Sequence, residues 1–272
     1  HAVLHLLYAR FWHHVLHDLG HVSTREPFQK LFNQGMILGE DGSKMSKSRG
    51  NVINPDEIVD EYGADSMRLY EMFMGPLDKA KPWNTNGLQG CSRFINKLWD
   101  KVCSSKGISS CINADTANTE TFKLLHQTIK KVGADIENLR FNTAISQMMI
   151  FTNHLVTLNV INKDVLTTFT KLLAPFIPHT AEELWQRLGY VNSIAYEPWP
   201  EFDENLAKEN LINFAIQVNG KLRANIEIDA NAEKEDVLFQ SKENERIKAY
   251  LDGKELIKEI YVPGRLINLV VK

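Results

Sequence analysis

The chain has 272 residues, of which 43% are hydrophobic and 24% are charged, and its formal net charge is −3. This composition is typical of a globular protein, and the small negative charge means that binding to nucleic acid would need a local basic patch. No apolar run reaches the roughly 18 residues that a membrane-spanning helix needs. The three cysteines lack the paired spacing of a metal site, and their odd number favours a reducing compartment over a disulfide framework.

Helical and strand-like patterns alternate in the N-terminal part of the chain. Apolar residues recur every three to four positions over residues 4–19, which predicts a helix that ends at Gly20. A short apolar run at residues 36–38 is typical of a strand. Two further helices are expected, one capped by Asn54 and the next capped by Asp65.

Amphipathic helices dominate residues 84–204. Four long helical patterns follow one another, and Thr180 with Glu183 has the spacing of a capping box that would open a shorter fifth helix. Trp99 and Trp185 lie at core positions of these patterns. Helices that are apolar on one side and joined by short loops predict an antiparallel bundle. The first helix has an apolar stripe of Leu88, Cys91, Ile95, Leu98 and Val102.

The last segment, residues 205–272, has the pattern of a small α/β unit. Two alternating runs flank Asn219 and Gly220, which is a strong hairpin signal. A polar helical stretch over residues 234–251 and a final strand pair follow. The whole sequence therefore predicts an α/β fragment over residues 1–83, a mainly α bundle, and this terminal α/β unit.

A glycine-bracketed loop at residues 39–51 reads GEDGSKMSKSRGN. It has little to bury, so packing cannot offset the entropy lost when it is ordered, and a ligand is the usual alternative. Lysines and hydroxyl groups in that setting suit a phosphate, and Gly39, Gly42 and Gly50 are suitable hinges. A basic loop that is simply solvated would have the same composition.

Several segments resemble the class I aminoacyl-tRNA synthetases. Residues 44–48 match the KMSKS signature of that family, and the order and spacing of the other segments are those of the leucine, isoleucine and valine enzymes. The first helix and the tail resemble the leucyl-tRNA synthetases of the bacterial and organellar type. The resemblance covers essentially the whole chain and is carried by HAVLHLLYARFW, GSKMSKSRGNVINPDEIVDEYGADSMRLYEMFMGP, LAPFIPHTAEELW, YEPWP, IQVNGKLRANIEI and YVPGRLINLVVK.

The resemblance implies ATP, bound with Mg²⁺, as a substrate and residues 1–83 as the C-terminal part of a Rossmann-type catalytic domain. In the family the amino-acid carboxylate attacks the α-phosphate of ATP, and pyrophosphate leaves. Lys47 is then expected to contact the ATP phosphates, with Lys44, Ser46 and Ser48 in support and Met45 as a further ATP contact. Ammonium groups on a mobile loop can stabilise the charge that builds on the leaving group.

Histidines are frequent in the first helix. His1 and His5 lie one turn apart, as do His13 and His17, and such pairs can chelate zinc. No HExxH glutamate and no third ligand accompany them, so we expect no bound metal; a polar helix face accounts equally for His13 and His17. The resemblance implies instead that His5, and with it His1, lines the leucine pocket.

The resemblance also implies tRNA(Leu) as a partner, with residues 84–204 as an anticodon-binding domain. Arg93, Lys97 and Lys101 follow one another at four-residue spacing on the first bundle helix, and such a row can track an RNA backbone or form only a solvated face. Residues 205–272 resemble the C-terminal domain that reaches the tRNA in leucyl enzymes. The candidate contacts there are Lys221, Arg223 and Arg265.

The His-Ile-Gly-His signature and the editing insertion of the family do not occur in this sequence. We therefore expect the distal half of a leucine-activating enzyme, inactive alone, that works with the remainder in cis or as a partner subunit. Two alternatives are a tRNA-binding module that has lost catalysis and an isoleucyl- or valyl-specific enzyme. The intact loop favours catalysis, and the tail favours leucine. We expect a cytoplasmic or organellar location, with neither a membrane nor DNA as a partner.

Overall fold

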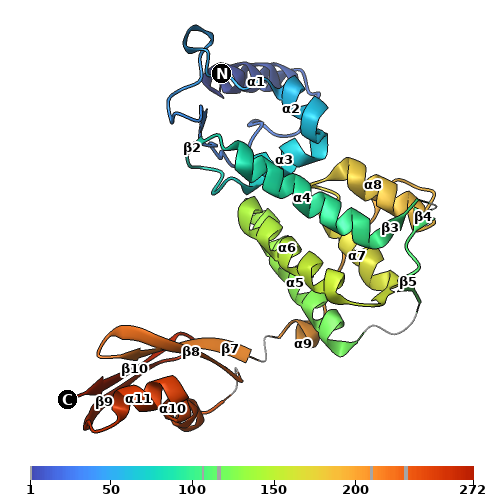
Figure 1. The fold of residues 1–272 in the computed structure, drawn as a ribbon. Helices are drawn as coiled ribbons and strands as arrows, with labels where there is room; N and C mark the ends of the chain where they lie inside the picture. Colours follow the sequence, from blue (N-terminus) through green and yellow to red (C-terminus); the bar gives the residue numbers. More distant parts are fainter. Residues whose placement is uncertain (1, 106, 115–117, 209–210, 230–231) are drawn as a thin grey trace.

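A computed structural model describes residues 2–105, 107–114, 118–208, 211–229 and 232–272 of the chain. Figure 1 shows the N-terminal elements at one end of a helical bundle and a C-terminal sheet with two helices beyond its other end. Within these described ranges, no helix is long and apolar enough to cross a membrane.

The N-terminal part is organised around a pair of short parallel strands. β1 and β2 pair in parallel, although helices α2 and α3 separate them in the sequence. α1 is followed by Gly20 at a φ of +77°, and Asn54 Oδ1 caps α2 by accepting from the Asp56 amide, both as predicted. The elements are α1 (Ala2–Asp18), β1 (Ile37–Leu38), the 3-10 turn η1 (Lys47–Arg49), α2 (Pro55–Tyr62), α3 (Ala64–Phe73) and β2 (Lys81–Pro82).

Long helices form the middle of the chain, as the amphipathic patterns predict. The predicted apolar stripe of the first of them is buried. Trp185 is also buried, whereas Trp99 is only half-buried and carries the Arg187 guanidinium 4.7 Å above its ring. The elements are α4 (Thr85–Val102), β3 (Cys103–Ser104), β4 (Gly107–Ile108), β5 (Ile112–Asn113), α5 (Thr119–Glu137), α6 (Phe141–Thr157), β6 (Ile161–Asn162), α7 (Lys163–Leu173), α8 (Pro178–Arg187), the 3-10 turn η2 (Ile194–Tyr196) and α9 (Glu204–Ala207).

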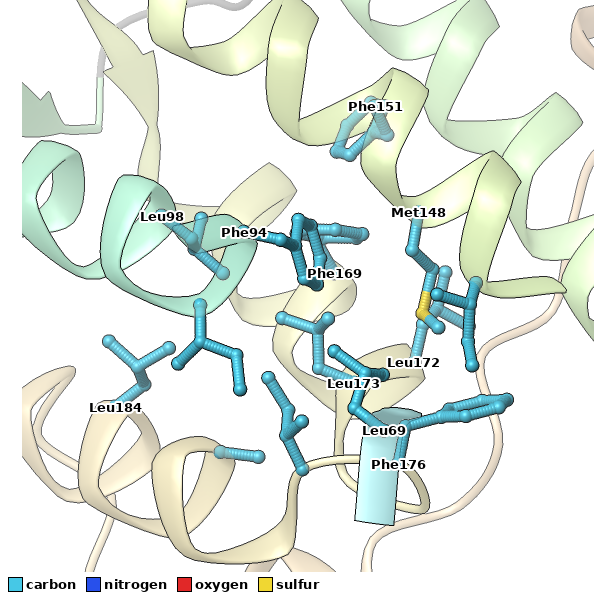
Figure 2. Close-up of a cluster of buried hydrophobic side chains, with 14 of the residues drawn as sticks. Leu69, Phe94, Leu98, Met148, Phe151, Phe169, Leu172, Leu173, Phe176 and Leu184 are labelled. Carbon is cyan, nitrogen blue, oxygen red and sulfur yellow. The ribbon is translucent and has the colours of Figure 1, made fainter. Parts of the chain in front are cut away.

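One buried core joins the bundle to the preceding helix α3. Figure 2 shows Leu69 of α3 among side chains of α6, α7 and the segment that leads to α8. Leu69 and Trp83 both belong to the same hydrophobic cluster as the bundle helices. The predicted division at residue 83 is therefore crossed by continuous apolar packing, which fixes the position of α3 against the bundle.

The C-terminal unit has a separate core of its own. Its strands lie in the order β8-β7-β10-β9, with β7 and β10 parallel. Asn219 and Gly220 have φ angles of +50° and +75°, which gives the tight hairpin predicted between β7 and β8. The predicted single helix is instead two, because Asn244 caps a new helix there. The elements are β7 (Leu211–Val218), β8 (Lys221–Asp229), α10 (Lys234–Glu243), α11 (Glu245–Leu251), β9 (Leu256–Val262) and β10 (Leu266–Val271).

Two predicted helix caps are wrong. Asp65 does not cap α3, which begins at Ala64 with no side-chain cap. α8 begins at Pro178, so Thr180 lies inside its first turn, and Glu183 pairs with Arg187 at 2.7 Å instead of closing a capping box. The Asp65 carboxylate accepts hydrogen bonds from both the amide and the hydroxyl of Thr180 at 2.6 Å. The carboxylate predicted for one helix therefore caps another.

Candidate nucleotide-binding loop

The loop at residues 39–51 leaves the end of β1 and has a firmly held base. The Trp83 amide donates to the Leu38 carbonyl oxygen at 2.9 Å, next to the paired strands. The Thr85 hydroxyl donates to Glu40 Oε1 at 2.9 Å and accepts from the Trp83 indole at 3.2 Å. These contacts connect the start of the loop to the start of α4, so the loop projects from a fixed point.

The loop's cations are free, while its acids are occupied. Lys44, Lys47 and Arg49 are exposed, and within the described residues their side chains have no hydrogen-bond or ion-pair partner. Glu40 is bonded to Thr85, and Asp41 accepts from the amide and the hydroxyl of Ser43 at 3.0 and 2.7 Å. These bonds from Ser43 lower the pKa of the Asp41 carboxyl. The loop therefore presents uncompensated positive charge to a ligand.

The other predicted loop residues lie close to these cations. The hydroxyl oxygens of Ser46 and Ser48 are 3.0 Å apart, on either side of Lys47 at the start of the η1 turn. Met45 is half-buried and packs against the main hydrophobic core. Its side chain therefore fastens the middle of the loop to the body of the protein, and its contact with ATP stays a prediction.

Two loop residues absent from the sequence prediction organise its backbone. The Asn51 side chain accepts from the Ser46 amide at 2.9 Å and donates to the Ser43 hydroxyl at 2.9 Å. Gly39, predicted as a hinge, is buried against the same side chains. Asn51 follows a glycine at the end of a polar loop, a common position for asparagine, so the sequence holds no distinguishing signal for this role. Asp41 is the second unpredicted residue.

Helix α1 has an uncovered surface that includes one of the two predicted pocket residues. His5 is exposed, and His1 lies outside the described residues. His13 Nε2 lies 2.7 Å from the Thr24 carbonyl oxygen, which gives it a structural partner. Among the described residues no three His, Cys, Asp or Glu side chains gather as potential metal ligands. Large apolar side chains of α1 are also exposed, namely Val3, Leu4, Leu7, Tyr8, Phe11, Trp12 and Leu16.

The predicted basic row on α4 is not a uniform surface. Lys97 Nζ donates to Asn153 Oδ1 on α6 at 2.7 Å, and the partly buried Lys101 Nζ donates to the Leu158 carbonyl oxygen at 2.5 Å. Both lysines therefore hold α4 against the end of α6. Arg93 is exposed and has no side-chain partner within the described residues.

The three candidates in the C-terminal unit also differ from one another. Lys221, the first residue of β8, and Arg265, in the turn just before β10, are both exposed. Arg223 lies on β8 with its guanidinium 4.4 Å from the centre of the Tyr250 ring of α11. Arg223 thus connects the sheet to a helix, whereas Lys221 and Arg265 remain available to a partner.

Comparison with known proteins places this loop in a family. The model of class I tRNA synthetases for isoleucine, leucine, methionine and valine matches residues 8–83, and the model of the anticodon-binding domain of tRNA ligases matches residues 119–238. Both matches are to parts of tRNA synthetases, and over these residues the chain is similar to the class I tRNA synthetases. The first match contains the whole loop together with β1, β2 and most of α1.

Leucine enzymes are among the proteins similar to this chain. Leucine–tRNA ligases of Chlorobium chlorochromatii and Chlorobaculum tepidum are each 53% identical over the whole chain, which spans 34% of their length. A LeuRS from Agrobacterium radiobacter K84, solved in a ternary complex with tRNA and LeuAMS, is 37% identical with a TM-score of 0.66. The match covers all of this chain and 36% of that one. The chain thus spans about a third of the relatives it matches.

Proposed function

We propose that this chain forms part of a leucine–tRNA ligase and supplies the loop that binds the phosphates of ATP while leucine is activated. The uncompensated cations of residues 39–51 carry this proposal, because Lys44 and Lys47 have free ammonium groups while both loop acids are occupied. The similarity over the whole chain to leucine–tRNA ligases supports leucine over isoleucine or valine.

The proposed reaction requires charge to be neutralised at the leaving group. The leucine carboxylate attacks the α-phosphate of ATP, the bond from that phosphorus to the bridging oxygen breaks, and leucyl-adenylate and pyrophosphate form. Mg²⁺ bound with ATP would add positive charge at the phosphates. Lys47 would contact the phosphates, and Lys44 would add positive charge beside it. Donors fixed in place before the reaction stabilise the developing charge without reorganisation, which is why the held base of the loop matters.

The exposed face of α1 supports a catalytic site completed by further protein. Phe11 and Trp12 are 61% and 60% exposed, and Leu7 is 60% exposed, although their spacing is that of a helix face that packs on a core. We propose that the remainder of the ligase, in cis or as a partner subunit, covers this face and completes a Rossmann-type catalytic domain. His5 would then border the leucine pocket.

The rest of the chain is proposed to bind tRNA(Leu). Residues 84–204 would form the anticodon-binding domain, and residues 205–272 would reach another part of the tRNA. The solved relative contains tRNA, which supports this assignment. Arg93, Lys221 and Arg265 are the predicted contacts whose charged groups are exposed. A cytoplasmic location, with an organellar one as the alternative, is part of the same proposal.

Pyrophosphate exchange in a leucine–tRNA ligase that contains this sequence tests the proposal. We expect Lys47→Ala to lower leucine-dependent ATP–pyrophosphate exchange by about 10²-fold, as for the loss of one oxyanion donor. The matched control is Lys79→Ala, since Lys79 is exposed and its ammonium group has Asp78, at 3.1 Å, as its one ion-pair partner among the described residues. Unchanged exchange in Lys47→Ala would remove Lys47 from this role, whereas a wild-type protein that binds tRNA but shows no exchange would favour a non-catalytic tRNA-binding module instead.

A further inference from the structure

A network of four residues fixes the shape of the loop at its base. Asp41, Ser43 and Asn51 are joined by hydrogen bonds, and Gly39 is buried against them. A β-carbon on Gly39 would lie 2.7 Å from Asp41 Oδ1 and 2.8 Å from Asn51 Nδ2. Glycine at position 39 therefore lets the Asn51 side chain approach the loop backbone.

The orientation of the Asn51 amide follows from its partners. The Ser46 main chain offers an N–H donor 2.9 Å away, and this donor requires the oxygen Oδ1 to face it. The nitrogen Nδ2 then faces the Ser43 hydroxyl at 2.9 Å, with the Lys44 carbonyl oxygen at 3.5 Å as a longer contact. The Asn51 side chain thus contacts three residues on the other side of the loop, namely Ser43, Lys44 and Ser46.

We propose that Asn51 is the positioning residue of the phosphate-binding loop, an assignment that rests on the proposed function. Its amide holds residues 43–46 in the backbone conformation from which the Lys44 and Lys47 ammonium groups project. Asn51 is half-buried and directs its amide into the loop, so it acts through the lysines. Holding the backbone in place before the ligand binds lowers the entropic cost of bringing the lysine ammonium groups to the phosphates.

The physical part of the proposal is tested on this chain by amide hydrogen exchange measured by NMR. We expect Asn51→Ala to speed exchange of the Ser46 amide by on the order of three- to tenfold, because one hydrogen bond is lost. The control is Asn54→Ala, which removes the cap of α2 without touching the loop. Equal Ser46 exchange in Asn51→Ala and wild type would overturn the proposal.

The functional part is tested by pyrophosphate exchange in a ligase that contains this sequence. We expect Asn51→Ala to lower kcat by about tenfold with the KM for leucine unchanged, and Gly39→Ala to have a similar effect by displacing the same side chains. Gly90→Ala is the control, because a β-carbon there has no neighbour within 4 Å. Normal kcat in Asn51→Ala, alongside a loss in Lys47→Ala, would remove Asn51 from this role.

Failure of the proposed function is distinguishable from failure of this inference. If Lys47→Ala retains full pyrophosphate exchange, the proposed function fails, and the positioning of the loop by Asn51 is decided by the Ser46 amide alone. If Lys47→Ala loses exchange and Asn51→Ala loses both exchange and Ser46 protection, both proposals are supported.

Discussion

The carboxylate of Asp65 caps a helix that begins more than a hundred residues later. Asp65 Oδ2 accepts from the Thr180 amide and hydroxyl, and Oδ1 lies 2.9 Å from His179 Nδ1. α8 has no side-chain cap of its own, since Ile177 precedes its first residue. A negative charge at a helix N-terminus satisfies free amides and interacts favourably with the helix dipole. Asp65 therefore fastens α3, which follows the loop and α2, to the bundle.

We expect Asp65→Ala to lower the free energy of unfolding by about 2–3 kcal/mol, because it leaves the amide and hydroxyl of Thr180 without their acceptor in a partly buried site. Urea denaturation of the chain measures the change. Asp60→Ala, at an exposed position of α2, is the matched control and should change stability by less than about 0.5 kcal/mol. Equal effects of the two variants would show that the long-range cap contributes nothing.

The contrast between Asn54 and Asp65 shows what the sequence could predict. Asn54 caps the helix that starts at the next residue, so its role is visible in a local pattern. The same holds for the hairpin at Asn219 and Gly220, where backbone conformation depends on the two residues themselves. Asp65 has the same local signal as Asn54, yet its partner is set by how α3 packs on the bundle. Local sequence propensity cannot predict which helix Asp65 caps.

In the candidate site, too, the roles set by local sequence were predictable and the roles set by tertiary contacts were not. The free lysines of residues 39–51 were predictable because the motif names them. The role of Asn51 was not predictable, because it depends on how the loop folds back to bring Asn51 against Ser43 and Ser46. Lys97 and Lys101 have the spacing of an RNA-facing row, but spacing on one helix says nothing about the acceptors on α6 and just beyond it. Likewise, the apolar period of α1 predicts a packed face without predicting what covers it.

Lys101 and Arg93 should separate stability from RNA binding. We expect Lys101→Ala to destabilise the chain by about 1 kcal/mol, because it removes the bond to the Leu158 carbonyl oxygen. Arg93→Ala should leave stability within about 0.5 kcal/mol. In tRNA binding, Arg93→Ala should instead reduce the slope of log affinity against log salt by about 0.7–0.9, as for one lost phosphate contact.

Thermal unfolding and tRNA binding at several salt concentrations check this pair. We expect Lys101→Ala to lower the unfolding temperature without changing tRNA binding, and Arg93→Ala to change tRNA binding without changing the unfolding temperature. Loss of tRNA affinity in Lys101→Ala at unchanged stability would reverse the assignment and return Lys101 to the RNA-facing row.

Arg223 and Lys221 offer a second such pair in the C-terminal unit. Arg223 stacks on Tyr250 and also directs Nη1 to its hydroxyl at 3.4 Å, which joins β8 to α11. We expect Arg223→Ala to weaken this unit by about 0.5–1 kcal/mol, a typical value for a cation–π contact. Hydrogen exchange of the α11 amides measures it. Lys221→Ala should leave those amides unchanged and weaken tRNA binding; equal protection of α11 in both variants would contradict the structural role of Arg223.

The segment after α1 should respond to acid through Glu26. Arg10 donates to Glu26 at 2.8 Å from Nε and 2.7 Å from Nη2, which lowers the pKa of the Glu26 carboxyl to about 2. Because the pKa is lower in the folded chain, the pair stabilises the fold above the ordinary glutamate pKa of roughly 4.3, and this contribution is lost as the pH falls toward 2. Both side chains are largely exposed, so salt should weaken the pair.

An NMR titration of the Glu26 side chain measures this pKa directly. We expect a midpoint near 2 in the wild type and a clear rise in Arg10→Gln. The rise should stop short of the ordinary value, because His14 Nε2 lies 3.4 Å from Glu26 Oε1 and also lowers the pKa of that carboxyl. Arg25→Gln is the control, since Arg25 is exposed next to Glu26 and has no side-chain partner within the described residues. A wild-type midpoint above 4 would mean that the two side chains do not hold this geometry in solution.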